Sequence, residues 1–266
     1  MTASLPGPEC PVCNDTGTIN ELVWIDTGRE YNGKKILEQV ILVDPVTKLP
    51  PLCKCQKKRI FEKYNASAGM KPNERERFFE TAILDEENRQ QYEQGKRIVE
   101  TIDEHLKNGT IVYIFGDPAR AEKRQVSAYG TGKTYLTNCM GNELTRMQKQ
   151  AIYVTEDKLF EEIKATYSRD SAESESDVLF RYYNVPILMI DDLFKSKSTE
   201  WTEDKIFHLL NQRMEPGKVT IINSNFAPNR IHQTFSKNGP AISSRILGQS
   251  ILIELIGRDR RRDRRN

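Results

Sequence analysis

The sequence has no marked excess of charge of either sign. Its 40 lysines and arginines face 38 acidic residues, which leaves a net charge of +2. A broad basic surface is therefore excluded, and any contact with nucleic acid has to be local. At 266 residues the chain has room for one large domain and a small one.

Long apolar runs and a secretion signal are also missing. No hydrophobic stretch has the length needed to span a bilayer. The first residues, which include Pro6, Pro8 and Cys10, do not form a signal peptide. We therefore expect a cytoplasmic protein without a membrane partner. In that reducing compartment the five cysteines are expected to be metal ligands or core residues rather than disulfides.

What the sequence does contain is a phosphate-loop signature, Gly130-Thr131-Gly132-Lys133-Thr134. Glycines let backbone N–H groups close around phosphate oxygens, the lysine reaches the β- and γ-phosphates, and the threonine hydroxyl holds Mg²⁺. An apolar, β-branched run over 110–115 precedes the signature, and apolar residues at helical spacing follow it from Leu136. The sequence therefore predicts binding of ATP and Mg²⁺. The alternative is a glycine-rich turn before an ordinary helix.

The signature departs from its usual pattern at one position. The pattern G-x-x-x-x-G-K-[ST] requires a glycine at position 127, where this chain has Ser127. Gly116, Asp117 and Pro118 directly follow the strand, where the motif should begin. We interpret residues 119–129 as an insertion within the loop, so that Gly116, Asp117 and Pro118 meet the nucleotide together with Gly130. The insertion weakens the prediction of hydrolysis more than that of binding.

A pair of acidic residues ends the apolar run over 185–190. The first, Asp191, is expected to support Mg²⁺ beside the phosphate loop, and the second, Asp192, to polarise the attacking water. Because aspartate is shorter than the glutamate often found there, the sequence predicts at most a weak ATPase. The alternative is a buried strand that ends in a solvated turn.

Two further groups extend the predicted nucleotide site. Asn225 follows a strand expected over 219–224, and at this edge of a parallel sheet it can touch the γ-phosphate or the lytic water. Arg245 precedes a last strand, over 250–255, and is expected to reach the nucleotide of a neighbouring subunit as an arginine finger does. A surface arginine is the alternative. Residues 257–266 hold six arginines and two aspartates, for which phosphate contact and a solvated tail both remain open.

Four cysteines form two close pairs near the N-terminus. Cys10 and Cys13 make a C-x-x-C, and Cys53 and Cys55 make a C-x-C. Together they offer the four thiolates of a closed tetrahedral Zn²⁺ site. Strands are expected between the pairs, so the metal would clasp the base of a β-hairpin and supply most of its folding energy. A redox C-x-x-C is the main alternative, but no thioredoxin-like βαβ pattern surrounds it.

The remaining patterns set the expected boundaries. The hairpin strands are predicted over 22–26 and 36–44 with a turn over 28–33. A short helix over 56–64 and a linker over 65–73 follow. A long helix over 86–107, ended by a glycine, opens the large domain. We expect an α/β chain with domains at 1–75 and 76–266.

Taken together, these motifs resemble the DnaC/DnaI-type bacterial replicative helicase loaders, which are AAA+ ATPases with IstB-type transposition helpers as close kin. The two cysteine pairs are similar to the zinc module of these loaders. Residues 190–193 resemble their Walker B strand and residues 222–226 their sensor 1 strand, and Arg245 falls where their arginine finger lies. Gly257-x-Asp259-x-Arg261 resembles their sensor 2 motif, which implies that Arg261 touches nucleotide. The resemblance implies an AAA+ P-loop domain with a five-stranded parallel sheet, preceded by a small zinc-binding β-hairpin module.

The resemblance also implies partners. The N-terminal module would dock onto a DnaB-type replicative helicase, and the ATPase domain would bind single-stranded DNA and self-associate on ATP, in a bacterial cytoplasm and from a chromosomal or phage gene. Lys164, Tyr167 and Arg169 lie in the stretch that matches the family's DNA channel. A stacking tyrosine and two cations suit a single strand, whereas for Tyr167 taken alone we expect core packing rather than DNA contact.

Two other functions remain compatible with these residues. One is an IstB-like transposition helper, but such proteins commonly lack a cysteine module. The other is a nucleotide-independent adaptor between DNA and a helicase, in which the insertion has disabled the phosphate loop.

Overall fold

The computed structural model describes residues 10–43, 50–63, 65–195, 199–235 and 237–261. The chain divides into two compact units, Met1–Lys63 and Tyr64–Asn266. The division falls before the expected boundary at 75. Residues 65–73, expected to be a linker, instead belong to the second unit and pack against its helices and sheet. Ala66 and Met70 are buried there, and the Ser67 hydroxyl donates to the Asn142 side chain at 2.9 Å.

The first unit holds an antiparallel hairpin of β1 (Leu22–Tyr31) and β2 (Lys34–Ile41), followed by α1 (Lys54–Lys63). The turn is Asn32-Gly33, with φ angles of 51° and 73°. Both positive angles fit the two-residue hairpin turn that Asn-Gly favours. The predicted segment 28–33 therefore does contain the turn, but the strands continue farther than predicted, up to this dipeptide. The predicted strand end at Asp44 lies outside the described residues.

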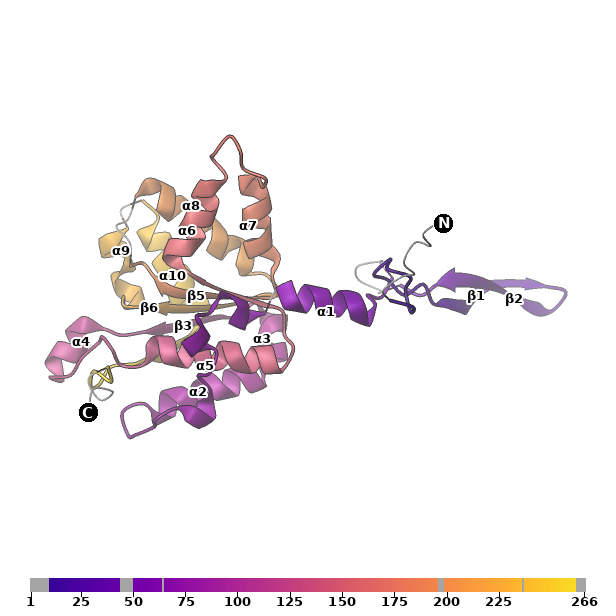
Figure 1. The fold of residues 1–266 in the computed structure, drawn as a ribbon. Helices are drawn as coiled ribbons and strands as arrows, with labels where there is room; N and C mark the ends of the chain where they lie inside the picture. The colour runs from indigo at the N-terminus through magenta and orange to yellow at the C-terminus, as the bar shows by residue number, and fades with distance from the viewer. Residues whose placement is uncertain (1–9, 44–49, 64, 196–198, 236, 262–266) are drawn as a thin grey trace, which may run out of the picture. The chain divides into compact units, whose positions relative to one another are not determined.

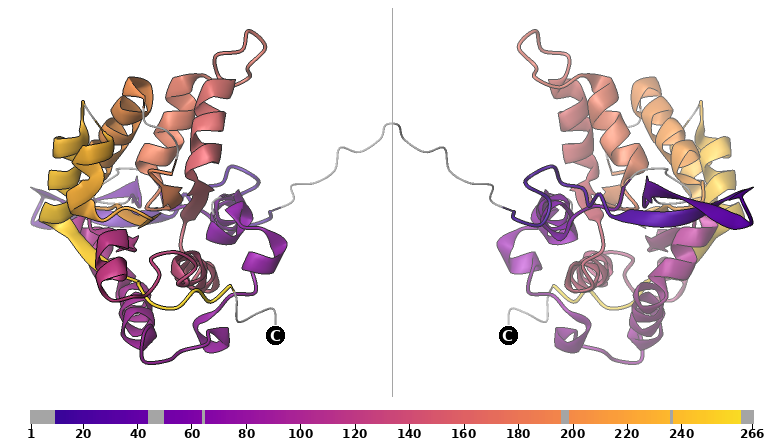
Figure 2. Two further views of the ribbon diagram at one scale, coloured as in Figure 1. Left: turned by 90° about the vertical axis from the view of Figure 1, so that its left-hand side faces the viewer. Right: turned by 90° about the vertical axis from the view of Figure 1, so that its right-hand side faces the viewer.

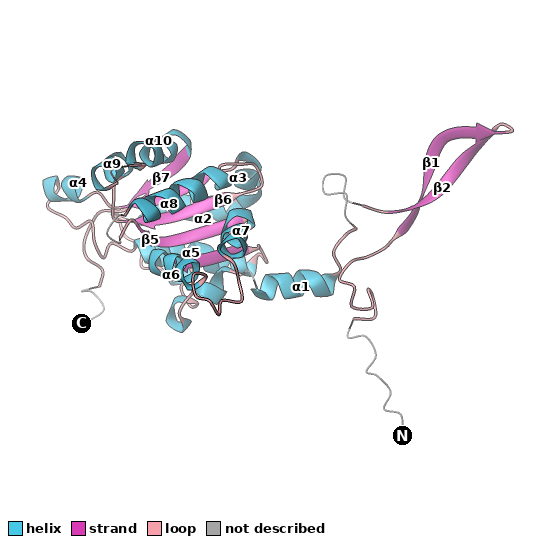
Figure 3. Ribbon diagram, turned by 90° about the horizontal axis from the view of Figure 1, so that it is seen from above, coloured by secondary structure: helices cyan, strands magenta, loops and turns pink. Residues whose placement is uncertain are grey.

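The second unit is built on a five-stranded sheet in the order β4-β5-β6-β3-β7, with every neighbouring pair parallel. The strands are β3 (Ile111–Phe115), β4 (Ala151–Thr155), β5 (Ile187–Leu193), β6 (Val219–Ser224) and β7 (Ser250–Glu254). All five residues of β3 are buried, as expected for a central strand covered on both faces. The predicted five-stranded parallel sheet is confirmed. Figure 3 shows the strands side by side between helices.

Helices cover both faces of this sheet (Figures 1 and 2). One face packs against α2 (Arg89–Glu100), α3 (Ile102–Asn108) and α5 (Lys133–Arg146). The other packs against α6 (Glu156–Ala165), α7 (Glu175–Asn184), α8 (Glu200–Arg213), α9 (Ile231–Thr234) and α10 (Gly239–Gln249). A short helix, α4 (Pro118–Lys123), follows β3. Cys139 is fully buried on α5, as the sequence predicts for a core residue.

The predicted helix over 86–107 is two helices. The backbone of Thr101, at φ −106° and ψ 25°, leaves the helical region between α2 and α3. Gly109 ends α3 at φ 63°, in the left-handed conformation that glycine adopts at low cost. No helix in the described part of the chain is both long and apolar enough to cross a bilayer.

A buried arginine holds the beginning of β5 and β6. Arg213 is 1% exposed, and its guanidinium donates to the carbonyls of Tyr182, Val185 and Val219 at 2.7–2.8 Å. Burial lowers the pKa of Arg213 to about 9. The ring of carbonyl acceptors satisfies the guanidinium without a carboxylate. Arg213 thereby fixes the strand whose far end carries the two acids.

Candidate nucleotide site and cysteine cluster

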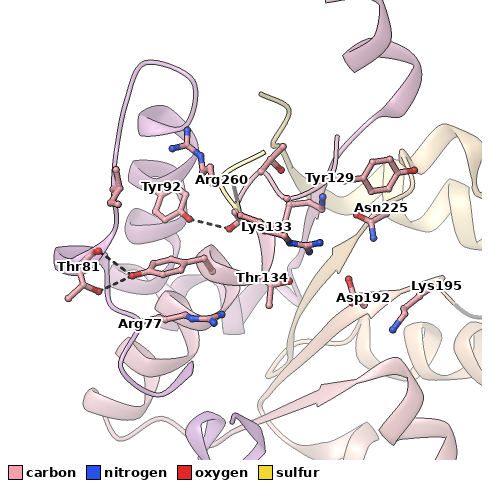
Figure 4. A pocket seen from close by; sticks show the side chains of 16 residues that line it. Arg77, Thr81, Tyr92, Tyr129, Lys133, Thr134, Asp192, Lys195, Asn225 and Arg260 are labelled. Atoms are coloured by element: carbon pink, nitrogen blue, oxygen red, sulfur yellow. Dashed lines mark hydrogen bonds between the residues drawn. The ribbon is translucent and has the colours of Figure 1, made fainter. Parts of the chain in front are cut away.

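A pocket of about 540 Å³ opens around the phosphate loop at the carboxyl edge of the sheet (Figure 4). Ligands of parallel α/β sheets bind at this edge. Five separate stretches of chain meet there, from before α2 to the C-terminal segment. The lining residues are Arg77, Thr81, Ile83, Tyr92, Tyr129, Gly130, Thr131, Gly132, Lys133, Thr134, Tyr135, Asp192, Lys195, Asn225, Arg260 and Arg261.

The phosphate loop itself is tightly tethered. Gly132 adopts φ 105°, and a side chain there would also approach the Tyr92 hydroxyl, which donates to the Gly132 carbonyl at 3.1 Å. The Thr131 hydroxyl donates to the Leu255 carbonyl at 3.0 Å. Lys133 begins α5, and its ammonium donates to the Ala128 carbonyl at 2.8 Å. The lysine is therefore held inside the loop, where a bound phosphate would lie.

The residues interpreted as an insertion lead away from the end of β3 and come back beside it. Asp117 caps α4 by accepting from the Ala119 N–H at 3.0 Å, and Ser127 pairs in both directions with Gly257 at 2.7 and 2.9 Å. The chain then comes back beside its starting point, because the Ala128 carbonyl oxygen lies 2.6 Å from where a Cβ on Gly116 would be. Gly116 therefore serves this close backbone approach.

Gly116, Asp117 and Pro118 do not line the pocket, contrary to the sequence interpretation. Asp117 and Pro118 are the cap and first residue of α4, which turns them into the inserted segment. Their expected places are taken by Ala128, which accepts from Lys133, and by Tyr129, which lines the pocket. The phosphate loop thus runs continuously from Ser127 to Thr134, with serine in the position of the first glycine.

The two acids at the end of β5 are arranged differently. Asp191 is 5% exposed and accepts from the Tyr153 hydroxyl at 2.8 Å, from Thr134 Oγ1 at 3.4 Å and from Asn223. Burial, and next Asp192, raise the pKa of Asp191. At Asp192 the strand is irregular and φ is 55°, and this carboxylate faces the pocket. A local break of this kind at a strand end re-aims a side chain toward a site.

The residues around Asp191 fit a hydrated Mg²⁺. Thr134 and Asp191 offer the hydroxyl and carboxylate that such an ion takes in phosphate-loop sites. Asn223 Oδ1 is buried and has no hydrogen-bond partner among the described residues, which leaves an acceptor for a metal-bound water. An Mg²⁺ held by these residues would supply positive charge to neutralise a bound triphosphate.

Asn223 was missed as a site residue by the sequence analysis. Its amide donates to Thr134 Oγ1 at 3.1 Å and to Asp191 from within β6. Asn225, the residue predicted, lines the pocket two positions farther on. No local pattern in the sequence singles Asn223 out, because its burial beside the acidic strand, which requires a polar partner, is created by the fold.

Cations converge on the phosphate loop from two directions. Burial lowers the pKa of Lys133 to about 8, a shift that Asp192 opposes and the nearby Arg261 charge increases. Arg261 lines the pocket as predicted, and so does Arg260. Arg260 donates to Asp85 at 2.7 Å through its side chain and to the Gly130 carbonyl at 3.0 Å through its backbone. Two like charges beside each other favour an anion between them.

Arg245 lies away from this pocket. Its guanidinium donates to the Asn211 side chain and to the Ala241 carbonyl at 3.1 Å, and it covers the Phe207 ring at 4.5 Å. The arginine is thus positioned within its own unit and does not reach the nucleotide pocket of the same chain.

The other end of the pocket was not predicted. Tyr92, Tyr135 and Thr81 form a wall in which the Tyr135 hydroxyl donates to the Thr81 carbonyl at 3.2 Å. Arg77 lies over the Tyr135 ring at 5.4 Å. Aromatic and apolar walls of this kind suit a planar ring such as a nucleobase. Tyr135 directly follows the phosphate-loop signature, but Arg77, Thr81 and Tyr92 come from segments without a recognisable motif, so sequence alone did not bring them together.

Lys164, Tyr167 and Arg169 lie on or just after α6. Tyr167 is 57% exposed, so core packing is wrong for it. Its hydroxyl accepts from Trp201 Nε1 at 3.1 Å, and the two rings meet edge-on at 6.5 Å. The ammonium groups of Lys164 and Lys205 lie 5.3 and 5.8 Å from the Trp201 ring. We call Lys164, Tyr167, Trp201 and Lys205 the aromatic–cation cluster.

The four N-terminal cysteines come together in the first unit. All four sulfurs lie within 4.8 Å of one another, with Cys10 and Cys53 at 3.8 Å and Cys13 and Cys55 at 3.4 Å. A zinc ion with four Zn–S bonds of ~2.3 Å places its sulfurs about 3.8 Å apart. The cluster therefore fits zinc.

The thiol chemistry of the cluster also suits a cation. Backbone N–H groups of Cys13 and Val12 lower the pKa of Cys10 to about 7. Cys13 and the other thiols raise the pKa of Cys55 to about 12, because a second thiolate beside the first is unfavourable without a cation.

The sheet order, the phosphate loop and the acidic strand end together define a P-loop ATPase domain of the AAA+ class. Residues 73–239 match the family described as the bacterial DnaA ATPase domain, and the chain belongs to this family.

The similar proteins act in replication. The chain is 27% identical over 143 residues to the replicative helicase loader DnaI of Bacillus subtilis (strain 168), a match that covers 50% of this chain and 45% of that protein. It therefore spans less than half of this relative's length. A crystal structure of DnaI has a TM-score of 0.57 at 24% identity and covers 70% of this chain and 94% of that one. AMPPCP-bound DnaA from Aquifex aeolicus has a TM-score of 0.54 at 25% identity, over 70% and 50% of the two chains.

These similarities confirm the predicted relation to the DnaC/DnaI-type loaders within the AAA+ ATPases. The family model that matches is that of the bacterial DnaA ATPase domain, and the similar proteins are replication initiators and a helicase loader.

Proposed function

We propose that the chain is an ATP-dependent replicative helicase loader that binds ATP with Mg²⁺ and delivers a DnaB-type helicase to single-stranded DNA. The observation that carries the proposal is the pocket in which Lys133, Asp192 and Arg261 meet, in a chain related to a helicase loader. ATP acts mainly as a switch. Hydrolysis is weak, because the water-activating acid, Asp192, is a short side chain.

Nucleotide binding assigns roles to the residues of the pocket. The N–H groups of Gly130, Thr131 and Gly132 and the Lys133 ammonium hold the phosphates. Thr134 and Asp191 hold Mg²⁺, Asp192 and Asn225 face the terminal phosphate and its water, and Arg261 adds positive charge. Arg245 reads the γ-phosphate of a neighbouring subunit, so self-association on ATP would complete the site.

The aromatic–cation cluster is the proposed contact for single-stranded DNA, together with Arg169. An exposed tyrosine beside a tryptophan offers faces on which bases stack, and the lysines meet phosphates. The cluster is local, in agreement with a chain of net charge +2.

Replacing Tyr167 by alanine should weaken binding of labelled oligo-dT about 5- to 150-fold, because stacking on one aromatic contributes ~1–3 kcal/mol. Tyr167→Phe keeps the ring and should retain most of the affinity. Fluorescence anisotropy at fixed salt measures both. Tyr31→Ala, which removes an exposed tyrosine of the hairpin, is the matched control. Equal affinities for Tyr167→Ala and the wild type would remove Tyr167 from the DNA contact.

The cysteine-bearing unit is proposed to hold zinc and to dock the helicase. Its hairpin exposes several large apolar side chains on the two strands, namely Leu22, Trp24, Ile25, Tyr31, Leu37 and Ile41. An immobilised full-length chain should retain a hexameric DnaB-type helicase, and a variant with Trp24 and Leu37 replaced by serine should lose it. Retention by this variant equal to that by the wild type would contradict docking through the hairpin.

A further inference from the structure

Lys195 faces the nucleotide pocket from the wall formed by the end of β5. It follows the acidic pair by three positions and lines the pocket together with Asp192 and Asn225 (Figure 4). The phosphate loop, with Lys133, forms another wall of the same pocket. Lys195 is therefore a cation at the end of the pocket where the acids lie.

The backbone of Lys195 is fixed while its ammonium is weakly held. The Lys195 N–H donates at 2.7 Å to Glu156, which is 3% exposed and opens α6. The ammonium lies 3.4 Å from Asp157, and both side chains of this ion pair are more than half exposed. An exposed pair of this kind contributes at most about 1 kcal/mol, so the ammonium can change partners at little cost.

A triphosphate offers the stronger partner. When Lys133 and the loop N–H groups hold the β-phosphate, the chain of phosphates continues toward Mg²⁺ and the two acids. The terminal phosphate carries more negative charge than the single carboxylate of Asp157. Its charge-assisted hydrogen bond to the Lys195 ammonium is therefore the stronger of the two. With its β-phosphate at Lys133, a diphosphate would lack the group that extends toward Lys195.

We infer that Lys195 binds the terminal phosphate and lets the site distinguish a nucleoside triphosphate from a diphosphate. This inference rests on the proposed nucleotide site and names the residue that reads the third phosphate. In the absence of nucleotide the ammonium is held by Asp157. Binding of the triphosphate breaks that pair.

Isothermal titration of the full-length chain with AMPPCP–Mg²⁺ and with ADP–Mg²⁺ tests this assignment. Lys195→Ala should weaken AMPPCP roughly tenfold or more and leave ADP within about twofold, as expected for one hydrogen bond between charged groups. Asp157→Asn should tighten AMPPCP alone, because it releases the lysine. Lys158→Ala, which removes an exposed lysine from the same turn of α6, is the control and should change neither.

The outcomes separate this inference from the nucleotide site on which it rests. If the wild type binds both nucleotides and Lys195→Ala weakens both equally, or neither, Lys195 does not read the terminal phosphate and only this inference fails. If the wild type binds neither nucleotide, the proposed site fails and the inference fails with it. Unchanged thermal melting of Lys195→Ala without nucleotide shows that its fold is intact.

Discussion

Mg-ATP at a hundredfold excess over its dissociation constant is expected to stabilise the wild type and to leave Lys133→Ala unchanged. Such an excess contributes about 2.7 kcal/mol, which raises the melting temperature of a domain of this size by roughly 5–10 °C. Lys133 is the cation inside the phosphate loop. Its ammonium is already positioned there by the hydrogen bond that it donates to the Ala128 carbonyl. Without it the loop N–H groups remain, but the main charge opposite the β- and γ-phosphates is gone.

Differential scanning fluorimetry with and without Mg-ATP measures this effect. Lys158→Ala keeps the site and should shift like the wild type. A nucleotide-dependent rise in Lys133→Ala equal to that of the wild type would contradict phosphate binding at this loop. The absence of any rise in the wild type would support an adaptor that works without nucleotide.

The same lysine predicts a pH dependence of binding. Burial lowers the pKa of Lys133 to about 8 in the nucleotide-free chain. A triphosphate needs the charged form, so affinity should fall as the pH rises from 7 to 9, when the free chain loses this proton. Titration calorimetry of the wild type across this range measures the fall, and an affinity that stays constant from pH 7 to pH 9 would contradict this role of Lys133.

Removal of zinc is expected to unfold the N-terminal unit. Among the described side chains of this unit, Cys13 and Cys53 are the buried hydrophobic ones, so the unit has almost no apolar core of its own. Structural zinc contributes an apparent ~10–16 kcal/mol in small modules, far more than a two-stranded hairpin can supply. A strong chelator, or Cys13→Ser, should therefore make residues 1–63 sensitive to protease while the ATPase unit stays resistant.

The measurement pairs limited proteolysis with metal content. The wild type should carry one zinc per chain, and added zinc should restore resistance after chelation. A hairpin that resists protease in chelator, in a purified chain without metal, would contradict a structural zinc site. The cysteines would then be interpreted as redox thiols.

The sequence was most informative where chemistry is local. The glycines and lysine of the loop, the acids at the end of β5 and the two cysteine pairs are all short motifs, and the structure brings each set together. Apolar runs between helical patterns indicated the single strands, whereas the five-stranded parallel sheet was implied by the resemblance to AAA+ loaders. Hydrophobic periodicity carries this information because strands and helices bury one face at fixed intervals.

The sequence was least informative where a residue depends on distant partners. The extra segment after β3 was recognised but wrongly placed within the loop, because the phosphate loop begins only at Ser127 and Asp117 and Pro118 begin α4 outside the pocket. The backbone pairing of Ser127 with Gly257 joins segments far apart in the chain, and no local pattern indicates it. Asn223 and Tyr92 were missed for the same reason. Each acts through a contact with the phosphate loop or the acidic strand that only the fold creates.

The most direct test of the central claim is a crystal structure of the chain with AMPPCP and Mg²⁺. The account predicts phosphate oxygens within hydrogen-bond distance of the Lys133 ammonium and of the N–H groups of residues 130–134. It places Mg²⁺ between Thr134 and the acidic strand end, with the base against Tyr92 and Tyr135. Nucleotide bound elsewhere, or a pocket that stays closed to phosphate because Lys133 keeps its bond to Ala128, would contradict it.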